Sequence, residues 1–234
     1  MQLQNKILTT YYVGVNDPQR ATEWEVNPAD FEKLAVSCTE KEVDLVIINN
    51  AFENEKIGDI EYLSRPCVFN PYFNRWIHYY QYLRDHPEIE FAFCVDATDV
   101  ELINIPFQEM ENGVIYCGDE PDFIGDNIWL KRHHPNEVLQ QFFVDYGERQ
   151  MINAGVLGGS REDLMAFIHN IIILFMNNRE DLIHNKSLPL GDTDMGVFNF
   201  VGHKIWNKKL EYGRKVTNVF KSYIVDNKSW FKHK

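Results

Sequence analysis

Two aspartates follow directly after a short apolar run. The run is Phe91–Val95, and Asp96 and Asp99 come after it with two residues between them. In open α/β sheets, ligands bind beyond the carboxyl ends of the strands, which is where Asp96 is expected to lie. Because residues i and i+3 point to opposite faces of a continuing strand, the two carboxylates can share one site only if the chain turns after Asp96.

Two converging carboxylates repel each other unless a cation lies between them. A divalent Mn²⁺ or Mg²⁺ ion that also contacts a diphosphate would remove this repulsion, since such ions take a few carboxylates together with substrate oxygens. The spacing therefore predicts a metal site at Asp96 and Asp99. The alternative is a polar turn in which Asp99 caps the next element.

Two further segments have residue types that suit ligand binding. Residues 152–160 form a strand-like run with three glycines before a helix, where the backbone can approach an anionic or hydroxyl-rich group. Residues 191–199 place Asp192 and Asp194 before an amphipathic stretch. Taken singly, the first segment is equally compatible with an ordinary strand-to-helix turn, and the second with helix capping by Asp192.

Together and in order, these segments resemble the GT-A-type glycosyltransferases. The similarity is to a group, related to family 8, whose metal motif is an aspartate pair of the form D-S-R-D-V, matched here by Asp96-Ala-Thr-Asp99-Val100. An N-A-G segment follows at Asn153–Gly155. The D-Q-x-x-x-N helix start is matched by residues 194–199, with Met195 in place of Gln. The resemblance covers about residues 6 to 200.

The resemblance implies one Rossmann-like α/β domain of the GT-A type over residues 1–234, with a mainly parallel sheet flanked by helices. It also implies the transfer of a sugar from a UDP- or GDP-sugar donor to a glycan or other hydroxyl acceptor. Mn²⁺ or Mg²⁺ would act as a Lewis acid that neutralises the charge on the departing diphosphate.

The same resemblance implies a role for individual residues. Asp99 would bind the metal, and Asp96 would hold the ribose or the metal, with His233 as the candidate third ligand. Asp194 would act at the reacting centre, as general base if the enzyme inverts or as a stabiliser of positive charge if it retains. The residues implied to contact the donor are Thr9, Thr10 and Tyr11 near the base, Arg75 at the phosphates or sugar, and Asn153, Ala154 and Gly155 at the sugar.

Short apolar strands alternate with helix-like stretches along the chain, as in a mainly parallel sheet that is buried on both faces. The aromatic residues between Trp76 and Tyr82 are expected in the core, and His133 and His134 at a solvated helix entrance. The expected strands are Ile7–Tyr12, Leu45–Ile48, Phe91–Val95 and Val114–Cys117, and the expected helices are Asn27–Glu40, Pro71–Asp85, one after Pro135, and Ser160–Asn177.

Composition limits the possible classes of protein. With 234 residues, 44% of them hydrophobic, the chain can form one sizeable domain. A net charge of −12 argues against a general nucleic-acid binder. The four cysteines form no C-x-x-C pair and are expected to be reduced. Because no apolar stretch is long enough to span a bilayer, we expect no transmembrane segment and a cytoplasmic location.

Charge is unevenly distributed along the chain. Residues 204–234 contain nine Lys and Arg but only two acidic residues, so the rest of the chain is strongly acidic. Because a donor diphosphate is anionic, part of this basic segment is predicted to close over it, through Lys221, Lys228 and Lys232 with Trp230 as an apolar anchor. The alternative is that the segment packs on the acidic body or docks on an anionic partner.

Two other functions compete with the transferase. A non-catalytic protein of the same fold could bind a nucleotide or glycan. A sugar nucleotidyltransferase also combines an α/β sheet with paired aspartates and Mg²⁺. Such an enzyme is expected to have a Gly-rich loop bearing Lys or Arg after the first strand, whereas residues 12–20 contain one Gly and no Lys.

Overall fold

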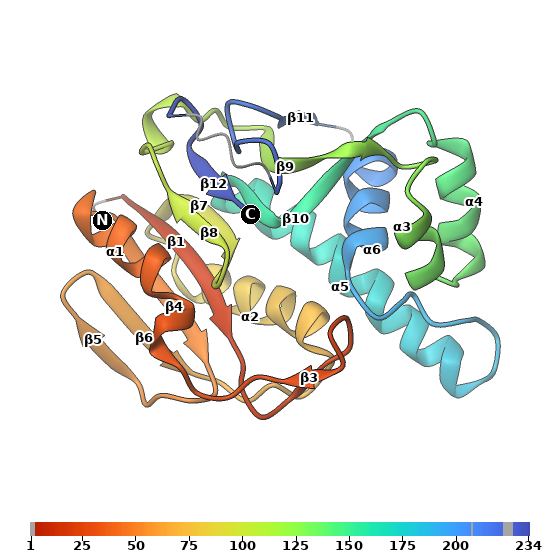
Figure 1. Cartoon of the computed structure of the whole chain (residues 1–234), viewed down its shortest axis with the longest axis horizontal. Helices are drawn as coiled ribbons and strands as arrows, with labels where there is room; N and C mark the ends of the chain where they lie inside the picture. Colours follow the sequence, from red (N-terminus) through yellow and green to blue (C-terminus); the bar gives the residue numbers. More distant parts are fainter. Residues whose placement is uncertain (1–2, 207, 222–226) are drawn as a thin grey trace.

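An eight-stranded sheet forms the centre of the molecule (Figure 1). The computed structural model describes residues 3–206, 208–221 and 227–234. In spatial order the strands are β11 (Lys209–Tyr212), β9 (Val114–Phe123), β10 (Gln150–Ser160), β7 (Ile89–Asp96), β1 (Gln4–Tyr11), β4 (Asp44–Asn49), β6 (Ile60–Ser64) and β5 (Glu55–Ile57). Two short pairs lie outside this sheet, β2 (Asn16–Asp17) with β3 (Thr22–Glu23) and β8 (Val100–Leu102) with β12 (Phe231–His233).

The strand directions explain where a site can form. Strands β7, β1, β4 and β6 run parallel to one another, β11 is parallel to β9, and β5 is antiparallel to β6. Strand β10 is antiparallel to both β7 and β9, so β7 and β9 run in the same direction. The expectation of a mostly parallel α/β sheet is confirmed. The carboxyl ends of β1, β7 and β9 and the start of β10 therefore lie at one edge of the sheet.

The predicted helices are present, and polar side chains cap them. Asn70 caps α2 and Ser160 caps α5, each accepting a backbone N–H of the first turn. Asn27 caps a 3₁₀ turn, Pro28–Asp30, which leads into α1. The helices are α1 (Glu32–Glu40), α2 (Pro71–Asp85), α3 (Ile128–His133), α4 (Glu137–Asp145), α5 (Arg161–Ile183) and α6 (Met195–Phe200), with a 3₁₀ turn at Phe107–Glu109 and a π-helical turn at Val201–Ile205.

Both faces of the sheet are covered, which accounts for the continuous apolar runs in the sequence. On one face, Leu8 packs in a core that includes side chains of α2 and α5. On the other, its neighbour Ile7 packs in a second core with residues of α1 and β12. Trp76, Tyr79 and Tyr82 are buried, as predicted. None of the described helices is long and apolar enough to cross a membrane, and the four cysteines form no disulfide.

Several described residues of the basic C-terminal segment pack on the body of the molecule. Trp230 is 1% exposed and its ring contacts Tyr116 edge-on at 5.2 Å, while Lys232 pairs with Glu101 at 3.1 Å. Arg214 pairs with Asp119 on β9. Trp230 is thus a buried apolar anchor of this segment, and the closure of the segment over a bound donor stays a prediction. The indole of Trp230 provides core packing, and the basic residues neutralise acidic ones.

Replacing Trp230 by alanine should lower the free energy of unfolding by about 3 to 5 kcal/mol, because a fully buried indole leaves a large void. Urea denaturation, followed by circular dichroism, measures this change. Val219→Ala is the matched control, since Val219 lies in the same segment but is 41% exposed. Equal midpoints for Trp230→Ala and the wild-type protein would contradict the packing described.

Candidate metal centre and ligand cavity

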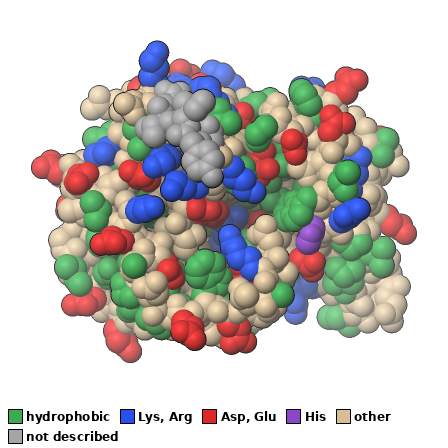
Figure 2. Space-filling view, viewed as in Figure 1, with side chains coloured by type: hydrophobic (Ala, Val, Ile, Leu, Met, Phe, Trp, Pro, Cys, Tyr) green, Lys and Arg blue, Asp and Glu red, His purple; other side chains and the backbone are tan. Residues whose placement is uncertain are grey.

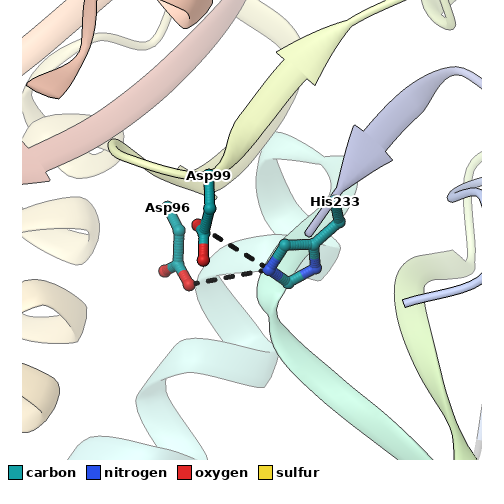
Figure 3. A group of neighbouring side chains, drawn as sticks. All are labelled: Asp96, Asp99 and His233. Carbon is teal, nitrogen blue, oxygen red and sulfur yellow. Dashed lines mark ion pairs between the residues drawn. The ribbon is translucent and has the colours of Figure 1, made fainter. Parts of the chain in front are cut away.

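The chain turns directly after Asp96, as it must if Asp96 and Asp99 are to share one site. Strand β7 ends at Asp96, residues 97–99 form a turn, and β8 begins at Val100. Both carboxylates consequently face the same space at the edge of the sheet (Figure 3). The expectation that the chain turns after Asp96 is confirmed.

The third side chain of the group comes from the end of the chain. Strand β12 pairs antiparallel with β8, which places His233 opposite Val100. The backbone N–H of His233 also donates to Asn218 Oδ1 at 2.6 Å. As a result, His233 Nε2 lies 3.9 Å from Asp96 Oδ2 and 3.8 Å from Asp99 Oδ1, and the ring points between the carboxylates (Figure 3).

These three residues fit a divalent cation. One ligand atom from each lies within 4.8 Å of the others. Asp99 Oδ1 is buried and has no hydrogen-bond partner among the described residues, an arrangement that is costly unless a ligand contacts it. A Cβ atom on Gly155 would lie 2.4 Å from His233 Cε1 and 2.7 Å from Asp96 Oδ2, so glycine keeps this space open. One imidazole with two carboxylates suits Mn²⁺ better than Mg²⁺.

Electrostatics agree with a cation at this position. Burial, together with the negative charge of Asp96, raises the pKa of Asp99 to about 7. Burial lowers the pKa of His233 to about 4, against the opposing effect of Asp96. The imidazole is therefore neutral at pH 7, which is the form that binds metals. A divalent ion would offset the negative charge of the two carboxylates and allow Asp99 to ionise.

Arg75 joins this group to Asp194 and does not present a free guanidinium. It pairs with Asp96 Oδ1, and its Nε and Nη2 donate to Asp194 Oδ2 at 2.9 and 2.7 Å. Its Nη2 also reaches the carbonyl oxygen of Ala154 at 3.3 Å. The predicted contact of Arg75 with donor phosphates is thus not supported by its placement. Arg75 holds two carboxylates in position.

Asp194 is buried, with its side chain 1% exposed. Its Oδ2 accepts three hydrogen bonds, two from Arg75 and one from Trp76 Nε1 at 2.7 Å. Burial raises the pKa of Asp194, although the neighbouring Arg75 acts in the opposite direction. Asp194 lines the cavity, and its action at a reacting centre stays a prediction.

The loop that carries Asp194 is fixed by His134. The Nδ1 atom of His134 is 2.8 Å from Leu190 O, and its Nε2 accepts from Gly196 N at 3.1 Å. A Cβ atom on Gly191 would lie 2.3 Å from His134 Nδ1, and one on Gly196 would lie 2.7 Å from His134 Cγ. The expectation that His134 is solvated is therefore wrong, because its ring is buried and braces the loop between the two glycines.

A cavity of about 590 Å³ opens beside the carboxylate–histidine group. Figure 2 shows Lys and Arg side chains gathered near the middle of the face that surrounds the C-terminus in Figure 1. The predicted residues that line the cavity are Thr10, Tyr11, Arg75, Asp96, Asp99, Asn153, Ala154, Gly155, Asp194 and His233. Thr9 and Lys228 do not line it, contrary to prediction. Thr9 is buried and its hydroxyl donates to Val95 O at 2.7 Å.

Other lining residues were not among the predicted site residues, although the sequence had marked Asp17–Arg20 as similar to the transferase group and Trp129 as a possible platform for a sugar. On the side of the N-terminal segment they are Asp17, Gln19, Arg20, Trp24 and Tyr72, and on the side of β9 and α3 they are Glu120, Asp122, Asn127 and Trp129. Glu120 could have been found. It follows the apolar run Val114–Cys117, to which the rule for carboxyl ends of strands applies as it does to Asp96. In the N-terminal group, the rule for carboxyl ends of strands does not apply to Trp24 and Tyr72.

The buried state of His134 predicts a pH-dependent stability. Burial lowers its pKa to about 4 from the ordinary 6.5, because a charged ring would be desolvated and would lose its acceptor role toward Gly196. Above pH 6.5 the neutral ring of His134 makes its full contribution to the free energy of unfolding. As the pH falls toward 4, the protein loses about 3 kcal/mol of this free energy. His134→Gln should show a shallower loss of unfolding free energy over this range in urea titrations.

The control is His184→Gln, which alters an exposed histidine at the end of α5. It should keep the wild-type pH dependence. Other buried histidines contribute to the wild-type slope, so the difference between the two variants is the quantity to measure. Identical slopes for His134→Gln and His184→Gln would show that His134 is not buried in its neutral form.

No model of a known protein family matches the sequence, and no curated protein has detectable similarity to it. The function has to be inferred from the residues of this chain and their geometry.

Proposed function

We propose that this protein is a Mn²⁺-dependent glycosyltransferase of the GT-A type, which transfers a sugar from a nucleoside-diphosphate sugar to a hydroxyl group. The observation that carries the proposal is the convergence of Asp96, Asp99 and His233 at the edge of a cavity, with Asp99 Oδ1 buried and without a hydrogen-bond partner among the described residues. A metal-bound diphosphate would supply the remaining oxygen ligands.

The N-terminal wall of the cavity suits a nucleoside. Tyr11, Trp24 and Tyr72 line it and offer aromatic surface for a base. Asp17 holds this wall together, since its carboxylate accepts from Arg20 Nη1 at 2.9 Å, from Trp24 Nε1 at 3.3 Å and from Tyr72 Oη at 3.1 Å. Asp17 therefore links the β2–β3 hairpin to α2 through these hydrogen bonds.

Positive charge for a diphosphate is available beside the metal group. Lys221 and Lys234 line the cavity, as does the half-exposed Arg20, which pairs with Asp17. The guanidinium of Arg75, by contrast, is buried and bound to Asp96 and Asp194. This supports part of the predicted role of the basic segment, through Lys221 and not through Lys228 or Lys232. When bound, the metal supplies Lewis-acid stabilisation of the leaving diphosphate. Arg75 and Asp194 keep Asp96 oriented toward it.

The test is a panel of UDP- and GDP-sugars incubated with and without Mn²⁺, with release of free nucleoside diphosphate as the readout. Hydrolysis of one donor only when Mn²⁺ is present is expected. Donor binding without any turnover would instead indicate a non-catalytic binding protein. Formation of a nucleoside triphosphate from donor and pyrophosphate would indicate a nucleotidyltransferase.

Asp99→Asn should weaken Mn²⁺ binding at least about tenfold and lower Mn²⁺-dependent hydrolysis to a similar degree or more, because it removes a ligand charge. Calorimetric titration with Mn²⁺ alone measures the first effect. The control is Glu101→Gln, which changes a carboxylate two residues away that pairs with Lys232. Wild-type Mn²⁺ affinity in Asp99→Asn would disprove the metal assignment.

A further inference from the structure

Glu120 lines the cavity and does not belong to the metal group, which consists of Asp96, Asp99 and His233. It lies on β9 just beyond the buried run that ends at Cys117, at the same edge of the sheet as Asp96. Its side chain lines the cavity opposite the N-terminal wall. Asn153 Nδ2 donates to Glu120 Oε1 at 2.7 Å. The other oxygen, Oε2, has no hydrogen bond to any described residue.

Asn153 connects Glu120 to the metal group in a fixed orientation. Its Oδ1 accepts the backbone N–H of Gly155 at 2.7 Å, so its Nδ2 is the atom that must face Glu120. Gly155 in turn lies directly against Asp96 and His233. Two short hydrogen bonds therefore set the position of the Glu120 carboxylate relative to the place where a metal-bound diphosphate would leave.

The carboxylates of Glu120 and Asp194 are held in different ways. Burial raises the pKa of Glu120, and the hydrogen bond from Asn153 and the charge of Lys221 only partly oppose this. Asp194, by contrast, is held by a guanidinium and an indole N–H through one oxygen. Protonating Asp194 would weaken the pair that fixes Arg75 and, through it, Asp96. Glu120 can change its charge without this consequence.

We propose that Glu120 is the general base that takes the proton of the acceptor hydroxyl, a proposal that rests on the transferase function. The O–H bond breaks as the hydroxyl oxygen bonds to the anomeric carbon of the donor. The bond from that carbon to the diphosphate oxygen breaks, its electron pair leaves with the nucleoside diphosphate, and the proton resides on Glu120. The reaction therefore inverts the anomeric centre, and Asp194 is a positioning residue.

The same part of the cavity indicates the class of acceptor. Trp129 lines the cavity near the start of α3, where Asn127 caps the helix and also donates to Asp122 Oδ2 at 2.8 Å. An indole face binds the apolar face of a sugar ring. The carboxylates of Glu120 and Asp122 would repel a phosphate or carboxylate on the acceptor. The acceptor subsite fits a sugar with free hydroxyl groups and no negative charge.

The experiment uses water and azide as acceptors, with the donor that the wild-type protein hydrolyses. Glu120→Gln should lower kcat for hydrolysis by about 100-fold or more, within the range expected for a general base, with an unchanged donor KM. Sodium azide needs no deprotonation and should restore turnover, giving a glycosyl azide of inverted configuration. Asp119→Asn, on the same strand but outside the cavity, should retain wild-type hydrolysis.

A second variant, Asp194→Asn, distinguishes the role of Asp194 from that of Glu120. It should also lose activity, because Arg75 loses a partner, but azide should not restore it. Azide rescue of Asp194→Asn and not of Glu120→Gln would overturn the proposal, as would a glycosyl azide of retained configuration or full hydrolysis by Glu120→Gln. If the wild-type protein hydrolyses no donor, the transferase function itself fails. If it hydrolyses a donor and Glu120→Gln does too, only the role of Glu120 fails.

Discussion

The arrangement of the cavity depends on two ion pairs that the buried guanidinium of Arg75 forms. This guanidinium bridges Asp96 at the end of β7 and Asp194 before α6, two carboxylates that come from distant parts of the chain. Removing one partner of such a buried pair typically costs about 3 to 5 kcal/mol, because it leaves an uncompensated charge. Once Asp96 is held in this way, it needs only a turn of three residues to bring Asp99 beside it.

The charges of this group leave room for one divalent cation. The ionised forms of Asp96, Asp99 and Asp194 carry three negative charges, and Arg75 offsets one of them, while His233 is neutral because burial lowers its pKa to about 4. The remaining two negative charges match the charge of Mn²⁺. Without the ion, the raised pKa of Asp99 reduces the repulsion instead.

The local parts of this arrangement could be predicted from the sequence, whereas the long-range parts could not. Asp96 and Asp99 stand next to an apolar strand, and the helix caps have short signatures. Thr9 was wrongly placed because it adjoins Thr10 in one strand but bonds to the backbone of β7. His233 was a candidate ligand only through the family resemblance, because its position beside Asp99 depends on the pairing of β12 with β8, two strands of three residues that no sequence pattern marks. Charge counting could not show which residues of the basic segment pack on the body, where Phe231 is buried and Lys232 pairs with Glu101.

Strand β10 explains why polar groups of different origin meet at one edge of the sheet. Since β10 runs against both neighbours, its first residues lie where β7 and β9 end. Asn153, near the start of β10, therefore stands between Asp96 and Glu120, which each follow an apolar run on their own strand. An entirely parallel sheet would place the Asn153–Gly155 segment at the opposite edge. Because β10 is antiparallel, Gly155 lies against Asp96 and His233, and the amide of Asn153, two residues earlier, donates to Glu120.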